Sequence, residues 1–541
     1  MKKLIFIFVI VYFFVGQVSA LELWLEPAGT YRTGIFDDRG AQILDYHAAS
    51  NRIFITNPGD QAIDIVNIQD VDNPELLLQL PLEGAPLSVA VHPTYELIAV
   101  AIEGEEVTDN GTVGFYTIDG ELLGSVVVGP LPDMITWTRD GRKVLVANEG
   151  EPTNTEYEPE DGEEFIDPNG SISIIKLGPG NSLQRKVQNA TVVEVGFEEF
   201  NDRKQELLDK GVRIYGPDAT VSQDLEPEYI TLGGGNRFAY VTMQENNAIA
   251  KINVLKAKVV DIIGVGYKDH SNEGNELDAS NKDDAINIRN WPVFGMYQPD
   301  AIDSFTVDDL LYLITANEGD ARDFEEKRVA KLDLSEVFGT PEEIEELQED
   351  ENLGRLNVTK AFPTTKDDEG NYTSLYSFGG RSFSILDADG NLVFDSGDQF
   401  EQITADLLPD YFNSTDDETA FDNRSDDKGP EPEHVIVGKI YGHTIAFIGI
   451  ERIGGIMAYD VSDPANPVFL DYVNNRNFEV DPQLDDGTTN PEAGDLGTEG
   501  LVFIPARRSP NGCPLIVASH EISGTTTVFK INVQPPPDED D

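Results

Sequence analysis

Short apolar runs alternate with polar turns along most of this chain. One such stretch has apolar runs at 434–440, 445–450 and 456–461, divided by a polar turn and by Gly454-Gly455. Runs of this length, with glycine and proline between them, predict β-strands. The same three-strand unit recurs along the sequence, so we expect a repeat protein.

The pattern predicts eight such units, and the spacing between them is uneven. They begin near residues 42, 87, 134, 229, 301, 374, 434 and 500. In the fifth unit the third strand is expected at Arg328–Leu332, and the sixth unit is expected to open with Ser374–Phe378. An additional strand at 21–27 is expected to lie at an edge or to close the structure. Helices are expected at 197–210 and after the capping residues Thr340 and Pro341.

Repeated units of three or four short strands are typical of one architecture. We predict an all-β fold, a β-propeller of seven or eight blades with inserted loops and short helices. Two separate β-sandwiches would also give many short strands. The regular pairing of acidic residues, described below, favours the propeller.

The first 20 residues differ from the rest of the chain. Two lysines precede an apolar run at 4–15, and Val18-Ser19-Ala20 resembles a cleavage site. This predicts a secretory signal peptide over 1–20, and no stretch is long enough for a membrane span. We therefore expect a secreted, extracellular protein with a propeller domain over 21–534 and an acidic disordered tail over 535–541.

The chain is strongly acidic, with 99 Asp and Glu against 38 Lys and Arg and a formal charge of −61. This charge excludes nucleic acid as a partner, because phosphate binding requires a basic surface. Such self-repulsion opposes compaction unless cations screen or bind it. The sequence leaves solubility in a saline medium and specific cation binding both open. The single cysteine, Cys513, cannot form an internal disulfide and is expected to be buried.

Acidic residues recur at two fixed places in the units. The second strand of six units ends on a glutamate: Glu103, Glu149, Glu245, Glu318, Glu451 and Glu521. Five of these units also carry an acid just before the first strand: Asp133, Glu228, Asp300, Glu433 and Glu499. The two places lie at the same end of a sheet, and the first strand of a propeller blade lies nearest the axis. We therefore expect the acids of these five units to surround one end of the central channel.

Crowded carboxylates repel one another unless they share protons, meet arginine or lysine, or bind a cation. Ligands that are all oxygen suit Ca²⁺ or Mg²⁺, and Ca²⁺ is favoured outside the cell. The ten acids of the five units are therefore candidate Ca²⁺ ligands. In the alternative, they accept hydrogen bonds from neighbouring blades or pair with arginine and bind no metal. Gln42 and Leu87 stand where two units would need an acid, so the ring is incomplete.

Other chemical motifs are few. The histidines lack zinc-site spacing, and no nucleophile elbow or phosphate-binding loop occurs. Asn-X-Ser/Thr sequons, which accept N-glycans where the host glycosylates, begin at Asn110, Asn169, Asn189, Asn357, Asn371, Asn413 and Asn423.

Several longer segments resemble the choice-of-anchor I family. They include FDNRSDDKGPEPE (421–433), IERIGGIMAYDVSDP (450–464), ITANEGDARD (314–323) and LDASNKDDAINI (277–288). The family includes mesenchyme-specific cell-surface glycoproteins linked to biomineral deposition. The resemblance implies a secreted or surface-held protein with a propeller-like fold. This chain departs from the usual pattern at GTEG (497–500), where GPEG is usual.

Three functions follow from these observations. The first is a non-enzymatic, Ca²⁺-binding propeller that interacts with divalent cations or a mineral surface, or with extracellular matrix proteins. The second is a Ca²⁺-dependent phosphoester hydrolase, similar to an alkaline phosphatase or a propeller phytase, with Arg322, Arg381 and Arg424 as candidate phosphate ligands. The third is an adhesion module that binds another protein through its loops. We favour the first.

Overall fold

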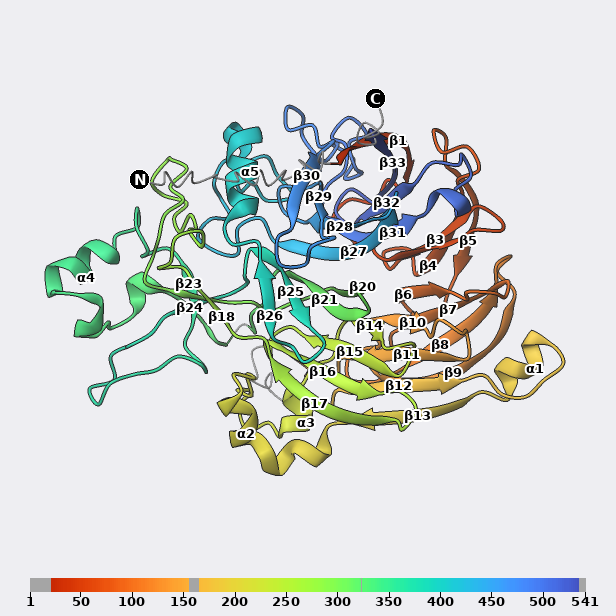
Figure 1. Ribbon diagram of the computed structural model, residues 1–541, viewed down its shortest axis with the longest axis horizontal. Coiled ribbons are helices and arrows are strands. Elements are labelled where there is room, and N and C mark those ends of the chain that lie inside the picture. The colour runs from red at the N-terminus through yellow and green to blue at the C-terminus, as the bar shows by residue number, and fades with distance from the viewer. Residues whose placement is uncertain (1–20, 155–164, 323, 535–541) are drawn as a thin grey trace, which may run out of the picture.

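The computed structural model describes residues 21–154, 165–322 and 324–534. The predicted signal peptide, the predicted tail and part of the acidic loop after Glu149 lie outside these ranges. Within them, most strands belong to seven four-stranded antiparallel sheets (Figure 1). An eighth sheet has five strands, two from the connection between the fourth and fifth of these sheets and three from an insertion within the fifth.

In the first four sheets, strands pair in the order in which they follow along the chain. Blade 1 contains β2 (Leu44–His47), β3 (Arg52–Asn57), β4 (Ala62–Asn67) and β5 (Glu75–Pro81). Blade 2 contains β6 (Pro86–Val91), β7 (Leu97–Ile102), β8 (Asn110–Thr117) and β9 (Leu122–Pro130). Blade 3 contains β10 (Ile135–Trp137), β11 (Lys143–Asn148), β12 (Ser171–Lys176) and β13 (Thr191–Gly196). Blade 4 contains β14 (Ile230–Gly233), β15 (Phe238–Met243), β16 (Ala248–Asn253) and β17 (Lys258–Gly264).

Of the remaining three blades, blade 6 also follows chain order, whereas blades 5 and 7 do not. Blade 5 contains β20 (Ile302–Val307), β21 (Leu310–Asn317), β25 (Ser382–Asp387) and β26 (Leu392–Asp395). Blade 6 contains β27 (Pro432–Ile440), β28 (His443–Ile450), β29 (Ile456–Asp460) and β30 (Val468–Val473). Blade 7 contains β31 (Thr498–Ile504), β32 (Leu515–His520), β33 (Thr525–Gln534) and, outermost, β1 (Glu22–Arg32).

The seven blades form a closed ring. Their first strands contact one another in the order β2, β6, β10, β14, β20, β27 and β31, and β31 contacts β2 again. The N-terminal strand β1 pairs antiparallel with the C-terminal strand β33, from Glu22 opposite Gln534 to Arg32 opposite Thr525. This pairing joins the two ends of the described chain in one blade. The predicted β-propeller is thus confirmed, with seven blades.

Apolar side chains of neighbouring blades pack face to face and form the core. The middle strands are almost fully buried, as in β7, whereas outer strands such as β5 are largely exposed. Between blades 7 and 1, for example, Val517 and Val528 pack with Ile53 and Ile55. Burial of both faces of each blade explains why the middle strands read as continuous apolar runs.

The fifth and sixth predicted units form one blade, so the eight predicted units give seven blades, within the predicted range of seven or eight. Strand β21 pairs with β25, so the two units are joined by a long insertion. The segment Arg328–Leu332 is not a blade strand, and Ser374–Phe378 supplies only the short strand β24 (Tyr376–Ser377) of the inserted sheet. Local patterning marks strands, but the partner of each strand depends on long-range packing.

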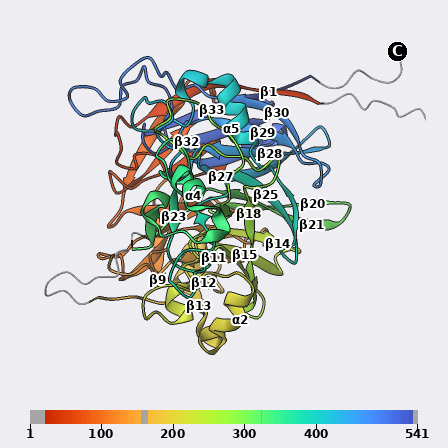
Figure 2. The same ribbon diagram turned by 90° about the vertical axis from the view of Figure 1, so that its left-hand side faces the viewer.

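The inserted sheet has its own small core. Its strands are β18 (Tyr267–Asp269), β19 (Phe294–Met296), β24, β23 (Asn357–Thr359) and β22 (Glu326–Arg328), in that order across the sheet. Trp291, Leu356 and Tyr372 are among the buried residues that pack together there. In Figure 2 this region, with β23 and the helix α4, faces the viewer.

Helices are short and lie in the connections. They are α1 (Leu183–Gln188), η1 (Glu198–Arg203), α2 (Lys204–Asp209), α3 (Val221–Asp224), η2 (Val329–Lys331), η3 (Glu336–Phe338), α4 (Pro341–Leu347), α5 (Gln399–Leu407), η4 (Pro409–Tyr411) and η5 (Ala506–Arg508). The helix predicted at 197–210 is present as the 3-10 helix η1 followed by α2, and Thr340 and Glu343 form the expected capping box of α4. None of the helices in the described ranges has the length and apolar content needed to cross a bilayer. Cys513 is exposed, against the expectation of burial, because it precedes β32.

Candidate metal centre

A repeated backbone hydrogen bond places the two acids of a blade side by side. The N–H of Glu149 donates to the carbonyl of Leu131, that of Glu451 to Glu431, and that of Glu521 to Gly497, at 2.8–2.9 Å. In each blade the acceptor lies two residues before the first acid, which is Asp133, Glu433 or Glu499. The acid before the first strand and the acid after the second strand therefore meet at the same end of the blade.

The residue two positions before the first acid has an unusual backbone conformation in three blades. Leu131, Gln298 and Glu431 adopt left-handed backbone conformations with φ of 44°, 44° and 52°. This region is unfavourable for residues other than glycine, so the surrounding structure must enforce it. The proline that follows each of them then leads directly into the acid. Backbone strain of this kind is concentrated at functional sites.

Bulges in the first strands complete the placement in blades 6 and 7. The register of β27 on β28 shifts between Pro432 and Val435, and that of β31 on β32 shifts between Thr498 and Leu501. Glu433 and Glu499 lie within these shifts. A bulge re-aims a side chain that regular pairing would point elsewhere.

Most of the ten predicted acids meet at one end of the channel. A cavity of about 190 Å³ there is lined by seven of them: Asp133, Glu149, Glu228, Glu245, Asp300, Glu433 and Glu499. Glu151 and Asp320, which the sequence analysis did not select, also line it, as do Gln42 and Leu87. Glu318 and Glu451 reach Glu433 from outside the cavity lining. Glu521 is also outside the cavity lining, and its charge acts on Glu499.

Three of these acids form a first triad, defined as Glu149, Glu228 and Glu245. One carboxylate oxygen of each lies within 4.8 Å of the other two. Glu149 follows the second strand of blade 3, and Glu228 and Glu245 flank the first two strands of blade 4. The triad therefore spans the junction of these two blades.

The first triad has buried oxygens without hydrogen-bond partners. Glu228 and Glu245 are each 6% exposed. One oxygen of Glu228 accepts the N–H of Gln244 at 3.2 Å, but its Oε2 and the Oε2 of Glu245 accept no hydrogen bond from the described residues. No lysine or arginine of the described chain forms an ion pair with the triad. An unpaired buried carboxylate is costly, so a proton or a cation is required.

The electrostatic environment agrees with this requirement. Burial, together with the charges of Glu151, Asp133 and Glu245, raises the pKa of Glu149 well above its ordinary value. Burial and the charge of Glu245 do the same to the pKa of Glu228. Burial raises the pKa of Asp133 to about 6. These carboxylates cannot all be ionised near neutral pH without a positive charge among them.

A second triad occupies the equivalent positions at the junction of blades 5 and 6. It consists of Glu318, Glu433 and Glu451, whose carboxylate oxygens also lie within 4.8 Å of one another. Unlike the first triad, it contacts two cations. Lys428 Nζ lies 2.6 Å from Glu318, and Arg452 Nη2 lies 3.1 Å from Glu451. Gln244 donates to the other oxygen of Glu318 at 2.6 Å.

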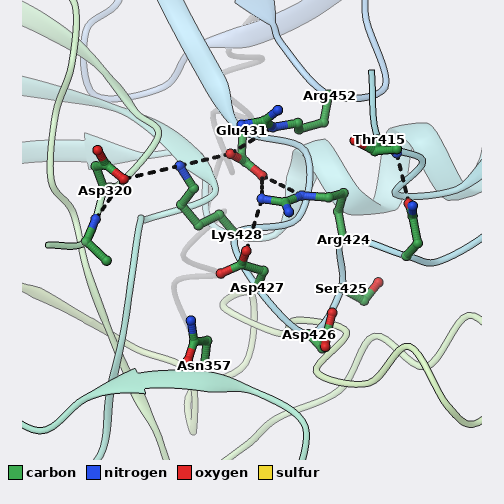
Figure 3. Close-up of polar contacts among 12 residues, drawn as sticks. Asp320, Asn357, Thr415, Arg424, Ser425, Asp426, Asp427, Lys428, Glu431 and Arg452 are labelled. Carbon is green, nitrogen blue, oxygen red and sulfur yellow. Dashed lines mark hydrogen bonds and ion pairs between the residues drawn. The ribbon is translucent and has the colours of Figure 1, made fainter. Parts of the chain in front are cut away.

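Glu431 gathers the cations beside the second triad, as Figure 3 shows. Its carboxylate lies 2.9 Å from Lys428, 2.5 Å from Arg424 and 3.0 Å from Arg452. Burial alone would raise the pKa of Glu431, but these three cations hold it well below its ordinary range. Neither Glu431 nor Lys428 was predicted from the sequence. The only local signal is that Glu431 extends the Pro-acid motif as Glu-Pro-Glu.

The three arginines predicted to hold phosphate are not grouped. Arg322 is buried against Asp224 and lies 2.6 Å from Glu226. Arg381 is buried 2.6 Å from Glu401 and donates to backbone carbonyls. Arg424 lines a cavity of about 250 Å³ that it shares with Lys428 and Arg452.

The sequons differ in exposure. Asn110, Asn169 and Asn189 are exposed, and Asn371 and Asn423 are half-buried. Asn357 and Asn413 are buried, and the Asn413 side chain donates to Glu401 and Ser425. The folded chain therefore does not present these two to a glycan-transferring enzyme.

The fold and site define a class of protein: a seven-bladed β-propeller with an acidic ring at one end of its channel. Residues 42–464 match the choice-of-anchor I domain. The chain belongs to the choice-of-anchor I family.

Two relatives are similar in sequence. Gigasin-3a of Magallana gigas is 32% identical over 197 residues, which cover 35% of this chain and 68% of that protein. The mesenchyme-specific cell surface glycoprotein of Strongylocentrotus purpuratus is 28% identical over 335 residues, covering 51% of this chain and 41% of that protein. This chain thus spans less than half of the length of the second relative.

Two solved structures align with most of the chain. Hydrazine synthase of Kuenenia stuttgartiensis aligns with a TM-score of 0.44 and 11% identity, covering 94% of this chain and 99% of that chain. The Cps50 (Swd1) β-propeller domain of Myceliophteria thermophila aligns with a TM-score of 0.41 and 6% identity, covering 95% and 100%. Both likenesses are too loose to add to what the sheet topology establishes.

Proposed function

We propose that this chain is an extracellular β-propeller that binds Ca²⁺ at the first triad and acts in matrix, cell-surface or mineral-associated interactions. The observation that carries the proposal is the pair of buried, unpartnered oxygens on Glu228 and Glu245, next to Glu149. Three carboxylates with no cation of their own have the chemistry of a hard-cation site.

The spacing of the first triad supports a cation of this kind. Ca²⁺ binds protein oxygens at about 2.3–2.6 Å, so two ligands of one ion lie at most about 5 Å apart. The triad oxygens meet this limit, since all lie within 4.8 Å of one another. Ca²⁺ needs six to eight oxygens, and water or other oxygens of the ring would supply the rest. The ion would also screen the neighbouring carboxylates, whose pKa values burial and mutual repulsion raise.

The relatives support the extracellular part of the proposal. One of them is named as a mesenchyme-specific cell surface glycoprotein. Five of the seven sequons are exposed or half-buried, which agrees with a glycoprotein surface. A role beside a mineral or in a matrix agrees with the acidic composition, because such a surface attracts divalent cations.

Calorimetric titration with Ca²⁺, combined with melting in Ca²⁺ or EGTA, tests the proposal. A ligand that binds only the folded state must stabilise it, so Ca²⁺ should raise the melting temperature and EGTA should lower it. Glu228→Gln and Glu245→Gln should remove both the heat of binding and the shift. Glu206→Gln, which changes an exposed helix residue, is the control. Absence of any binding heat and any shift in the native chain would end the proposal.

One observation favours the hydrolase as a second candidate function. Arg424, Lys428 and Arg452 line a cavity that shares Asp320 with the acidic cavity, so cations and candidate metal ligands are adjacent. A phosphoester could in that case meet both a metal ion and a basic side chain. Ca²⁺-dependent turnover of an aryl phosphate or phytate, lost in Arg424→Met, would support it. No turnover with Ca²⁺ present would remove it.

A further inference from the structure

The second triad differs from the first in one respect that its sequence positions do not reveal. Lys428 reaches it from a loop outside the blades, not from a strand. Its ammonium lies 2.6 Å from Glu318 and 2.9 Å from Glu431, with Asp320 at 4.0 Å. Figure 3 shows the side chain extended toward Glu431 and Asp320. The lysine side chain is 11% exposed, so solvent has little access to it.

The inserted sheet fixes the loop that carries Lys428. Asp426 forms ion pairs with Arg328 at 3.1 Å and Arg355 at 2.8 Å, and its carbonyl accepts the N–H of Asn357 at 3.0 Å. Arg381 donates to the carbonyls of Ser425 and Asp427, both at 2.8 Å. The residues just before Lys428 are thus held in place, and its side chain reaches Glu318 of the second triad.

We propose that the second triad is a cation site which the chain fills with its own Lys428 ammonium, so that no divalent ion binds there in the native protein. The lysine is a specificity-determining residue: it limits the ring to the ion of the first triad. Removing the ammonium should unmask a second site for Ca²⁺, made of Glu318, Glu433 and Glu451. The ion bound by the native chain at the first triad rests on the proposed function. The second site, unmasked by removal of Lys428, does not depend on it.

The electrostatics of the lysine support this assignment. Burial alone would lower the pKa of Lys428, but the charges of Glu318, Glu431 and Asp320 raise it well above its ordinary value. The ammonium therefore stays protonated at every physiological pH. A divalent ion would have to displace a cation that is already desolvated and held by several carboxylates.

The direct test is the number of Ca²⁺ ions bound per chain, measured by calorimetry and by metal analysis after dialysis. Lys428→Met removes the charge and keeps the bulk, and it should raise the number from one to two. Lys428→Arg keeps the charge and should leave the number at one. Adding Glu451→Gln to Lys428→Met should return it to one. A folded Lys428→Met chain that gains no ion, or a native chain that binds two, would overturn the proposal.

The proposed function and this inference predict different outcomes, so the failure of one can be distinguished from the failure of the other. If the native chain binds no Ca²⁺ but Lys428→Met binds one, the proposed function fails and this inference stands. If Lys428→Met does not fold, amine acetylation of the native chain followed by mass spectrometry decides. Lys428 should then be acetylated far more slowly than the exposed Lys327, equally with Ca²⁺ and with EGTA. Acetylation of Lys428 that rises with Ca²⁺ would mean that the metal displaces the lysine, which would contradict the inference.

Discussion

The two triads occupy equivalent places two blades apart. Each joins the glutamate after a second strand to the two acids of the next blade, and in each the oxygens lie within 4.8 Å of one another. The first triad meets no lysine or arginine within the described residues, whereas the second meets Lys428 and Arg452. Identical blade chemistry therefore leads to two different electrostatic solutions.

The difference comes from the connections and not from the blades. Blade 5 is interrupted by the inserted sheet, and that sheet anchors the loop that brings Lys428 to the second triad. The connection after Glu149, as far as the structure describes it, adds Glu151 to the acidic cavity instead of a base. In this propeller the repeated strand pattern determines where the carboxylates lie. The loops determine which positive charge lies beside them.

The largest effect should follow from removing the centre of the cation cluster. Glu431→Gln leaves Lys428, Arg424 and Arg452 without their shared buried carboxylate. Breaking a buried ion pair by removing one partner typically costs about 3–5 kcal/mol. The free energy of unfolding measured in urea should therefore fall by about that amount. Asp119→Asn, which removes an exposed pair with Arg52, should leave the midpoint unchanged. Equal shifts in the two variants would show that the cluster does not stabilise this region.

Charge removal within each triad sharpens the comparison. Glu228→Gln in the first triad should weaken Ca²⁺ binding by about 100-fold or more, because even outer partners of metal ligands cost 10–100-fold when lost. Glu433→Gln in the second triad should change the affinity much less, since that triad takes its cation from the chain. Calorimetry of the two variants measures both affinities. Equal loss in both would mean that the triads act as a single site.

The pH dependence of the metal-free chain should report on the crowded acids. Burial raises the pKa of Asp133 to about 6, and burial with the charge of Asp416 raises that of Glu521 to about 7. In the unfolded chain these groups titrate near 4, so between about pH 4 and pH 7 the folded state binds more protons. The contribution of these two groups to stability in EGTA should therefore be fully present below about pH 4 and be lost as the pH rises to about 7.

Calcium should reverse that trend, because it replaces protons as the counter-charge of the ring. Melting temperatures at pH 5, 6, 7 and 8, with Ca²⁺ and with EGTA, measure the effect. The difference between the two conditions should grow as the pH rises. A difference that is constant across this range would show that Ca²⁺ does not bind at the ring carboxylates.

The smallest expected effect is the loss of stability when the side-chain hydrogen bond of Gln244, which links the two triads, is removed. Gln244 donates its backbone N–H to Glu228 of the first triad and its side chain to Glu318 of the second. Gln244→Met removes only the side-chain bond and should cost about 1.5–3 kcal/mol, the range for hydrogen bonds to charged groups, toward its lower end because Lys428 remains. Chemical denaturation measures the cost. A change in Ca²⁺ affinity above about threefold, which is about 0.6 kcal/mol, would show that the two triads are coupled.

The sequence predicted the ring but not its asymmetry. Asp133, Glu228, Asp300, Glu433 and Glu499 could be found because each lies at a fixed place in a local strand pattern, and all five line the cavity. Lys428 could not, since its place depends on a loop held by a distant sheet. The merging of the fifth and sixth units was missed for the same reason, as the pairing of β21 with β25 spans the inserted residues.

Anomalous diffraction from crystals grown in Ca²⁺ tests the central claim most directly. It shows where an ion binds, which no titration does. We predict one peak between Glu149, Glu228 and Glu245 and none between Glu318, Glu433 and Glu451. A peak only in the second group, or no peak among the ring carboxylates at saturating Ca²⁺, would contradict the account.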